Sequence, residues 1–172
     1  NPYRKDAMAM ASFRYGFQNL ADCYEHGDNL DARAKMLAAS CMGGIAFSNC
    51  ALGIVHSIAH TFGAEYGVPH GLANAIVLPH VIAFNAGLRE AAGDNRRAAE
   101  RYARLAKTCQ LCPDNANDTA SLNALIQHIE QLKTTCKLPT LANALKEKKA
   151  EWSLCIPDMV QAALADATLR TN

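Results

Sequence analysis

Apolar residues recur along most of the chain at the three- and four-residue spacing of amphipathic helices. This spacing predicts helices over residues 7–24, 30–47 and 122–132, and another around Ala99 to Ala106. The most regular stripe is the third, formed by Leu122, Leu125, Ile126, Ile129 and Leu132. Alternating strand patterns are absent from the sequence. The predicted fold class is therefore all-α, a compact bundle of about seven to nine helices joined by short connections.

Capping residues predict where several helices begin and end. Gly27 stops the first helix, and Asp28 or Asn29 caps the second. Asp118 is a predicted cap for the helix that follows it. Gly93 with Asp94 marks another boundary.

Glycine and proline add two further expectations. Gly43 and Gly44 carry no side chain, so they allow another backbone to approach the second helix closely. Pro139 and Pro157 are each predicted to be a first helical residue, and the last helix to cover 158–169.

Residues 43–85 concentrate the candidate chemistry, with four of the six histidines and six of the ten glycines. A short helix is predicted over 54–62, then a turn at 67–69, then an apolar helix over 72–87. Pro79 within that last helix is expected to kink or divide it. Imidazoles among apolar residues need partners, because burying an unpaired polar group costs free energy.

The length of 172 residues predicts one helical domain, residues 1–172, apparently truncated at both ends. A formal net charge of +1 with no basic stripe argues against nucleic acid as a partner, and broken apolar runs argue against a membrane span. Seven widely spaced cysteines indicate reduced thiols and a cytoplasmic protein. Cys109 and Cys112 form a lone CxxC, for which core or surface thiols are the better interpretation.

Three histidines form a candidate metal site. His56 and His60 are four residues apart and face the same way on a helix, and the turn before His70 lets its ring fold back towards them. Neutral imidazole suits zinc, iron or nickel. The zincin protease motif is excluded, because no Glu follows His56. Hydrogen-bonded core histidines remain the alternative, since Glu65 is the only acidic residue between Asp31 and Glu90.

The stretch GIAFSNCALGIVHSIAHTFGAEYGVPHGLANAIVLPHVIAFN closely resembles the signature region of the iron-containing (group III) alcohol dehydrogenases. Flanking residues extend the resemblance over nearly the whole chain. Asn1, Pro2 and Asp6 match near the start, and Asp166, Thr168, Thr171 and Asn172 resemble the family's closing motif.

The resemblance implies an enzyme with an N-terminal domain that binds NAD or NADP and a C-terminal helical domain that holds a divalent metal, Fe²⁺ or Zn²⁺. His56 and His70 fall on two of the family's four metal ligands, and His60 falls on a catalytic histidine near nicotinamide and substrate. An Asp-x-x-x-His element, expected ahead of Asn1, would supply the other two ligands. His80 carries no role and is interpreted as structural, and His26 and His128 are predicted to face solvent.

The implied reaction is oxidation of a small alcohol or reduction of an aldehyde with NAD(P). The isolated chain is expected to be inactive without the nucleotide-binding domain. The alternative hypothesis is a free-standing helical binding or oligomerisation module, and in either case a homo-oligomer, most simply a dimer, is expected.

Overall fold

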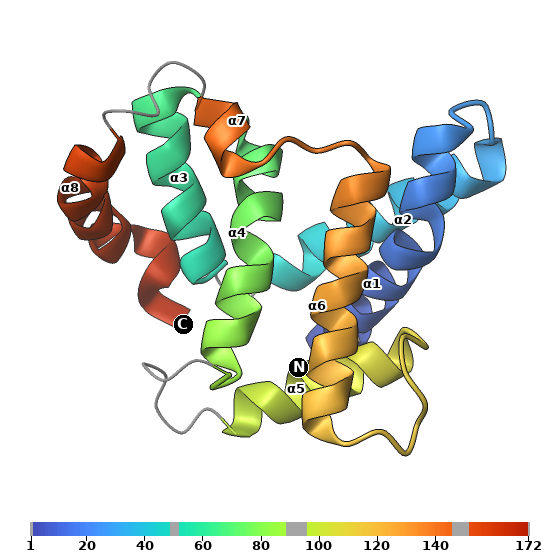
Figure 1. Cartoon of the computed structure of the whole chain (residues 1–172). Coiled ribbons are helices and arrows are strands. Elements are labelled where there is room, and N and C mark those ends of the chain that lie inside the picture. Colours follow the sequence, from blue (N-terminus) through green and yellow to red (C-terminus); the bar gives the residue numbers. More distant parts are fainter. Residues whose placement is uncertain (1, 49–51, 89–95, 146–151, 172) are drawn as a thin grey trace. The chain divides into compact units, whose positions relative to one another are not determined.

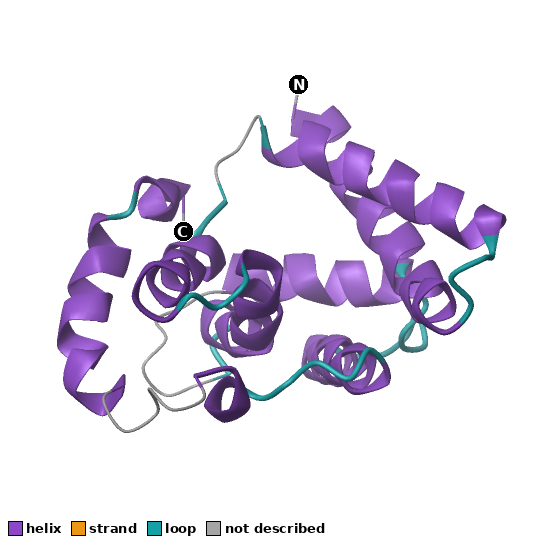
Figure 2. Cartoon of the chain, turned by 90° about the horizontal axis from the view of Figure 1, so that it is seen from above, coloured by secondary structure: helices purple, strands orange, loops and turns teal. Residues whose placement is uncertain are grey.

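The computed structural model describes residues 2–48, 52–88, 96–145 and 152–171 (Figure 1). The described residues form eight α-helices and one 3-10 helix. Figure 2 shows no strand among the described residues. The all-α prediction is confirmed. The boundary predicted at Gly93 and Asp94 falls outside the described residues. None of the helices in these ranges is both long and apolar enough to cross a membrane.

The chain divides into two compact units, one made of residues 1–50 and 82–136 and the other of residues 51–81 and 137–172. The first unit contains α1 (Pro2–Glu25), α2 (Leu30–Phe47), α5 (Arg96–Thr108) and α6 (Asp118–Thr135). The second contains α3 (Ile54–Tyr66), most of α4 (His70–Asn85), α7 (Leu141–Leu145), α8 (Trp152–Ala165) and the 3-10 helix η2 (Ala167–Thr171). The single domain expected from chain length stays a prediction.

In the first unit, α1 and α2 pack side by side after a short turn. Asn29 caps α2, accepting a hydrogen bond from the Ala32 backbone N–H at 3.1 Å. A Cβ added at Gly43 would lie 3.0 Å from the Ser12 hydroxyl oxygen, so a side chain of α1, and not the predicted backbone, approaches closely there. The same prediction is wrong for Gly44, where an added Cβ would meet no atom within 4 Å.

The remaining capping and proline predictions are corrected at four positions. The cap of α6 is Asn117 and not Asp118, because the Asn117 side chain accepts from the Ala120 N–H at 2.8 Å. Pro139 precedes α7 instead of opening it, since the helix begins at Leu141. Pro157 lies inside α8, which begins earlier than predicted, at Trp152. Pro79 does not divide α4, which continues through it from His70 to Asn85.

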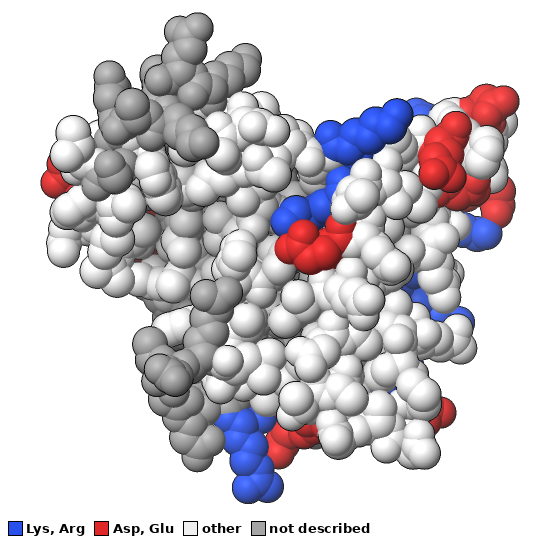
Figure 3. Space-filling view, in the orientation of Figure 1, with Lys and Arg blue, Asp and Glu red and all other residues white. Residues whose placement is uncertain are grey.

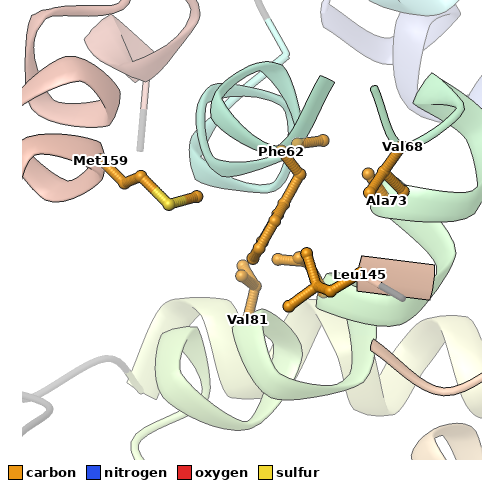
Figure 4. Packing of buried hydrophobic residues seen from close by; sticks show 8 residues of the cluster. Phe62, Val68, Ala73, Val81, Leu145 and Met159 are labelled. Atoms are coloured by element: carbon orange, nitrogen blue, oxygen red, sulfur yellow. The ribbon is translucent and has the colours of Figure 1, made fainter. Parts of the chain in front are cut away.

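The core of the second unit surrounds Phe62 of α3 (Figure 4). In Figure 4 the Phe62 ring points towards Val81 and Leu145. The same ring stacks on that of Trp152, with centroids 5.8 Å apart. Met159 of α8 joins the same cluster, which explains why α8 lies beside α3 in both views. This apolar core fixes the positions of α3 and α4, the two helices that carry the histidines of the candidate site.

Charged side chains are distributed in small mixed groups on the face drawn in Figure 3. Lys and Arg occur beside Asp and Glu there, and no broad basic area is visible on that face. This agrees with the formal net charge of +1.

Candidate functional site

The candidate site begins on α3, which carries His56 and His60 one turn apart. Their ring centroids lie 6.3 Å from each other. Both histidines are on the same side of the helix because residues four apart in an α-helix project in nearly the same direction. The described backbone thus confirms the helical spacing predicted from the sequence.

A left-handed turn returns the chain towards these two rings. Gly67 adopts φ +66°, a conformation that favours glycine, and the Val68 N–H donates to the Phe62 carbonyl oxygen at 3.3 Å. Val68 is buried in the core, so the direction in which the chain leaves α3 is set by packing as well as by the turn. α4 then starts at His70.

The turn brings the His70 ring against both histidines of α3. Its centroid lies 5.3 Å from that of His56 and 5.3 Å from that of His60, with which it is nearly parallel at 24°. The three residues singled out in the sequence are therefore together in the structure. Their individual roles as metal ligands and catalytic residue stay predictions.

Asp166 joins the cluster from the junction of α8 and η2. Its Oδ2 accepts a hydrogen bond from His60 Nδ1 at 2.8 Å, across 106 residues of sequence. Its Oδ1 accepts from the Thr168 backbone N–H at 2.8 Å and from the Thr168 hydroxyl at 2.6 Å. Reasoning from the residues alone assigned no role to Asp166, because no helical spacing links positions so far apart. Only its place in the closing motif gave a signal.

The electrostatics of the cluster favour an uncharged His56 ring and an ionised Asp166 carboxylate. Burial lowers the pKa of His56, and the nearby His70 and His60 lower it further. Hydrogen bonds from Thr168 and then from His60 hold the pKa of Asp166 well below its usual range. An uncharged imidazole with an available lone pair is the form that binds a metal.

These side chains fit part of a metal coordination sphere. His56 Nδ1 is buried and has no hydrogen-bond partner, so this nitrogen is available to bind a metal. His70 Nε2 lies 3.1 Å from Asn74 Nδ2. Within the described ranges, however, no group of three or more His, Cys, Asp or Glu side chains is arranged to hold a metal ion. The pair His56 and His70 therefore fits a metal only together with further ligands.

A cavity of about 260 Å³ lies between α3 and α8 next to this cluster. Its lining includes His60, Glu65, Cys155, Asp158 and Asp166. The cavity is thus partly apolar and partly acidic, and the histidine of α3 that contacts Asp166 forms one wall.

The other histidines lie outside the cluster. His26 is exposed, as predicted, and pairs with Asp22 at 2.8 Å. His80 is exposed on α4. The prediction for His128 is wrong: its ring is half-buried and packs edge-on against Phe17, with centroids 5.0 Å apart.

Comparison with known proteins identifies the family. Residues 1–172 match the C-terminal part of the Fe-containing alcohol dehydrogenase family. The chain belongs to this family. It is 56% identical over 167 residues to the 1-propanol dehydrogenase PduQ of Citrobacter freundii, covering 97% of this chain and 43% of that protein. It is 35% identical to the NADPH-dependent butanol dehydrogenase of Clostridium saccharobutylicum, of which it covers 40%.

Solved structures agree with the fold and with the family. A crystal structure of 1,3-propanediol oxidoreductase is 32% identical, with a TM-score of 0.85, and matches 100% of this chain and 41% of its own. The alcohol dehydrogenase from Oenococcus oeni is 28% identical, with a TM-score of 0.81, over 97% of this chain and 40% of its own. The chain therefore spans about two fifths of the length of the proteins that it matches.

Proposed function

We propose that this chain is the metal-binding helical part of an NAD(P)-dependent alcohol dehydrogenase, with His56 and His70 as two of the ligands of a divalent metal. The observation that supports this is the convergence of the two rings, whose centroids lie 5.3 Å apart although they come from different helices. Fe²⁺ is the expected metal from the family, and Zn²⁺ suits the same imidazoles.

The chain's own residues favour the uncharged histidine that such a site requires. Burial of His56 beside two other imidazoles keeps its ring neutral, as ligation requires. The remaining ligands come, in this proposal, from the Asp-x-x-x-His element that the family resemblance implies. The metal would act as a Lewis acid that polarises the substrate oxygen.

His60 is the proposed proton-transfer residue. Its side chain is 41% exposed and lines the cavity between α3 and α8, so a hydroxyl group in solution can reach the ring. A histidine held within hydrogen-bond reach of an alcohol can exchange the hydroxyl proton. The substrate class is a small alcohol or the corresponding aldehyde, because relatives bear the names 1-propanol, butanol and 1,3-propanediol dehydrogenase.

The test measures metal content and alcohol oxidation in the intact polypeptide that carries these 172 residues. Changes to residues beside metal ligands weaken metal affinity by about 10- to 100-fold, so loss of a ligand itself in His56→Ala should cost at least that much. His26→Ala, which removes an exposed histidine far along the chain, is the matched control and should keep both metal and activity. Full metal occupancy and turnover in His56→Ala would refute the ligand assignment.

A second candidate is a helical module for binding or oligomerisation. It is favoured by the apolar side chains that α8 exposes, among them Leu154 at 79%, Val160 at 48% and Leu164 at 58%. It predicts a dimer by light scattering, and a monomer at high concentration would count against it.

The six described cysteines are free thiols, and a cytoplasmic location remains part of the proposal.

A further inference from the structure

The carboxylate of Asp166 divides its two oxygens between two different tasks. Oδ1 accepts both hydrogen bonds from Thr168, which belongs to the same turn. Oδ2 points the other way and accepts from His60 Nδ1 on α3. A turn of this kind needs only one acceptor oxygen at its first residue. The second oxygen therefore makes a contact that local structure does not require.

The segment that carries Asp166 is itself fixed to the start of α3. The Gly53 N–H donates to the Thr168 carbonyl oxygen at 2.8 Å, and Gly53 is the N-cap of that helix. Thr168 thus holds Asp166 through its N–H and hydroxyl and holds α3 through its carbonyl. Because the same residue contacts both, the carboxylate has a defined position relative to His60.

An ionised carboxylate only accepts hydrogen bonds, so the proton of the 2.8 Å contact belongs to His60 Nδ1. In the neutral ring the second nitrogen, Nε2, then has the lone pair. The ring plane is held as well, at 24° to that of His70. Both the tautomer and the orientation of His60 follow from this one partner.

We propose that Asp166 is a positioning residue for His60: it holds the proton on Nδ1 and fixes the ring beside His70, so that Nε2 is the atom that accepts the proton of a substrate hydroxyl. In that transfer the O–H bond breaks and an N–H bond forms at Nε2, while the Nδ1 proton stays with the ring. The inference rests on the proposed function for the identity of the substrate. The tautomer itself does not depend on it.

The first experiment reads the tautomer without turnover. The metal-free intact polypeptide is labelled with ¹⁵N-histidine, and the His60 resonances are identified by their loss in His60→Gln. In spectra recorded at a pH where the ring is neutral, we expect its proton on Nδ1, because Asp166 Oδ2 accepts from that nitrogen. Asp166→Asn keeps an oxygen that can accept from Thr168 but turns an amide N–H₂ towards the ring, which should move the proton to Nε2. A wild-type ring protonated on Nε2, or a tautomer unchanged in Asp166→Asn, would overturn the proposal.

The second experiment separates positioning from a structural role. We expect Asp166→Asn to lower kcat for 1-propanol by about 10- to 100-fold, with KM for the alcohol and metal content changed less than about twofold. The loss is smaller than the roughly 10²- to 10⁴-fold that a proton-transfer group contributes, because His60 itself is still present. Asp114→Asn is the matched control, since it removes an exposed carboxylate that lies outside the cavity lining. A loss of metal, or equal losses of kcat in both variants, would contradict the proposal.

A double variant tests whether Asp166 acts through His60. If it does, His60→Gln combined with Asp166→Asn has nearly the kcat of His60→Gln alone, because the partner is already gone. If the kcat losses of the two single variants multiply in the double variant, the two residues act independently and the inference is wrong. Failure of the proposed function is distinguishable: the wild-type protein would then lack alcohol oxidation, while the ¹⁵N result would still decide the role of Asp166.

Discussion

Burial of the His128 ring against Phe17 makes the stability of the first unit depend on pH. Burial lowers the pKa of His128, and a hydrogen bond with the Phe17 backbone opposes part of that shift. Nε2 is buried without a hydrogen-bond partner. The residues beside it, Gln110, Gln127 and Gln131, carry no charge. The charged form of the ring is therefore disfavoured in the folded state.

The sign of the effect follows from the two states. In the unfolded chain His128 has the ordinary histidine pKa of 6.5, which is above its folded-state pKa, so the unfolded chain binds the proton more readily. The contribution of His128 is complete above pH 6.5 and is lost as the pH falls through its lowered folded-state value. We expect His128→Gln to flatten the fall in Tm between neutral and acidic pH by about 1–3 °C per pH unit. His26→Gln is the control, and an unchanged slope in His128→Gln would contradict the assignment.

The three site histidines and Asp166 differ in how far sequence alone can place them. His56 and His60 are linked by helical spacing. His70 follows a turn in which a glycine indicates that the chain reverses direction, so the proximity of the three rings was predictable. Asp166 reaches His60 only because α8 and η2 pack against α3. Such contacts depend on tertiary packing, which periodicity does not encode. His128 was placed wrongly for the same reason.

At the scale of single elements, α6 offers the clearest stability prediction. Leu125 is 0% exposed and lies on the apolar stripe read from the sequence. Leu125→Ala should destabilise the first unit by about 2–5 kcal/mol through lost burial and the cavity left behind. Leu37→Ala on α2 is the matched control, since Leu37 is 74% exposed and its loss should stay within about 0.5 kcal/mol. Urea unfolding followed by circular dichroism measures both, and similar midpoints would contradict the packing of α6.

Element boundaries were predictable where local chemistry decides them. α2 covers Leu30–Phe47 as predicted, since Asn29 supplies a strong cap. α8 was placed too late because Pro157 resembles a first helical residue. The helix extends back to Trp152, whose ring stacks on Phe62 in the core. Burial of that ring outweighs the single backbone hydrogen bond that Pro157 removes.

The two compact units differ in which of the predicted effects their residues control. The candidate site lies entirely in the unit formed by residues 51–81 and 137–172, where the histidines of α3 and α4 meet Asp166. His128 and Leu125 belong to the other unit. Substitutions there should change stability without a direct effect on metal binding, which makes the two sets of predictions independent.

On their own, the 172 residues should not catalyse alcohol oxidation. A catalytic metal site needs three or more protein ligands, and the described cluster offers two imidazoles whose donor atoms are not already paired with Asp166. Hydride transfer also needs a bound nicotinamide, and the relatives that perform it are more than twice as long as this chain. We therefore expect the isolated chain, supplied with Fe²⁺ or Zn²⁺, 1-propanol and NAD⁺ or NADP⁺, to form no reduced nicotinamide above a protein-free blank. The intact polypeptide, assayed beside it, should form the product. Sustained alcohol-dependent reduction by the isolated chain would mean that residues 1–172 contain a complete catalytic site.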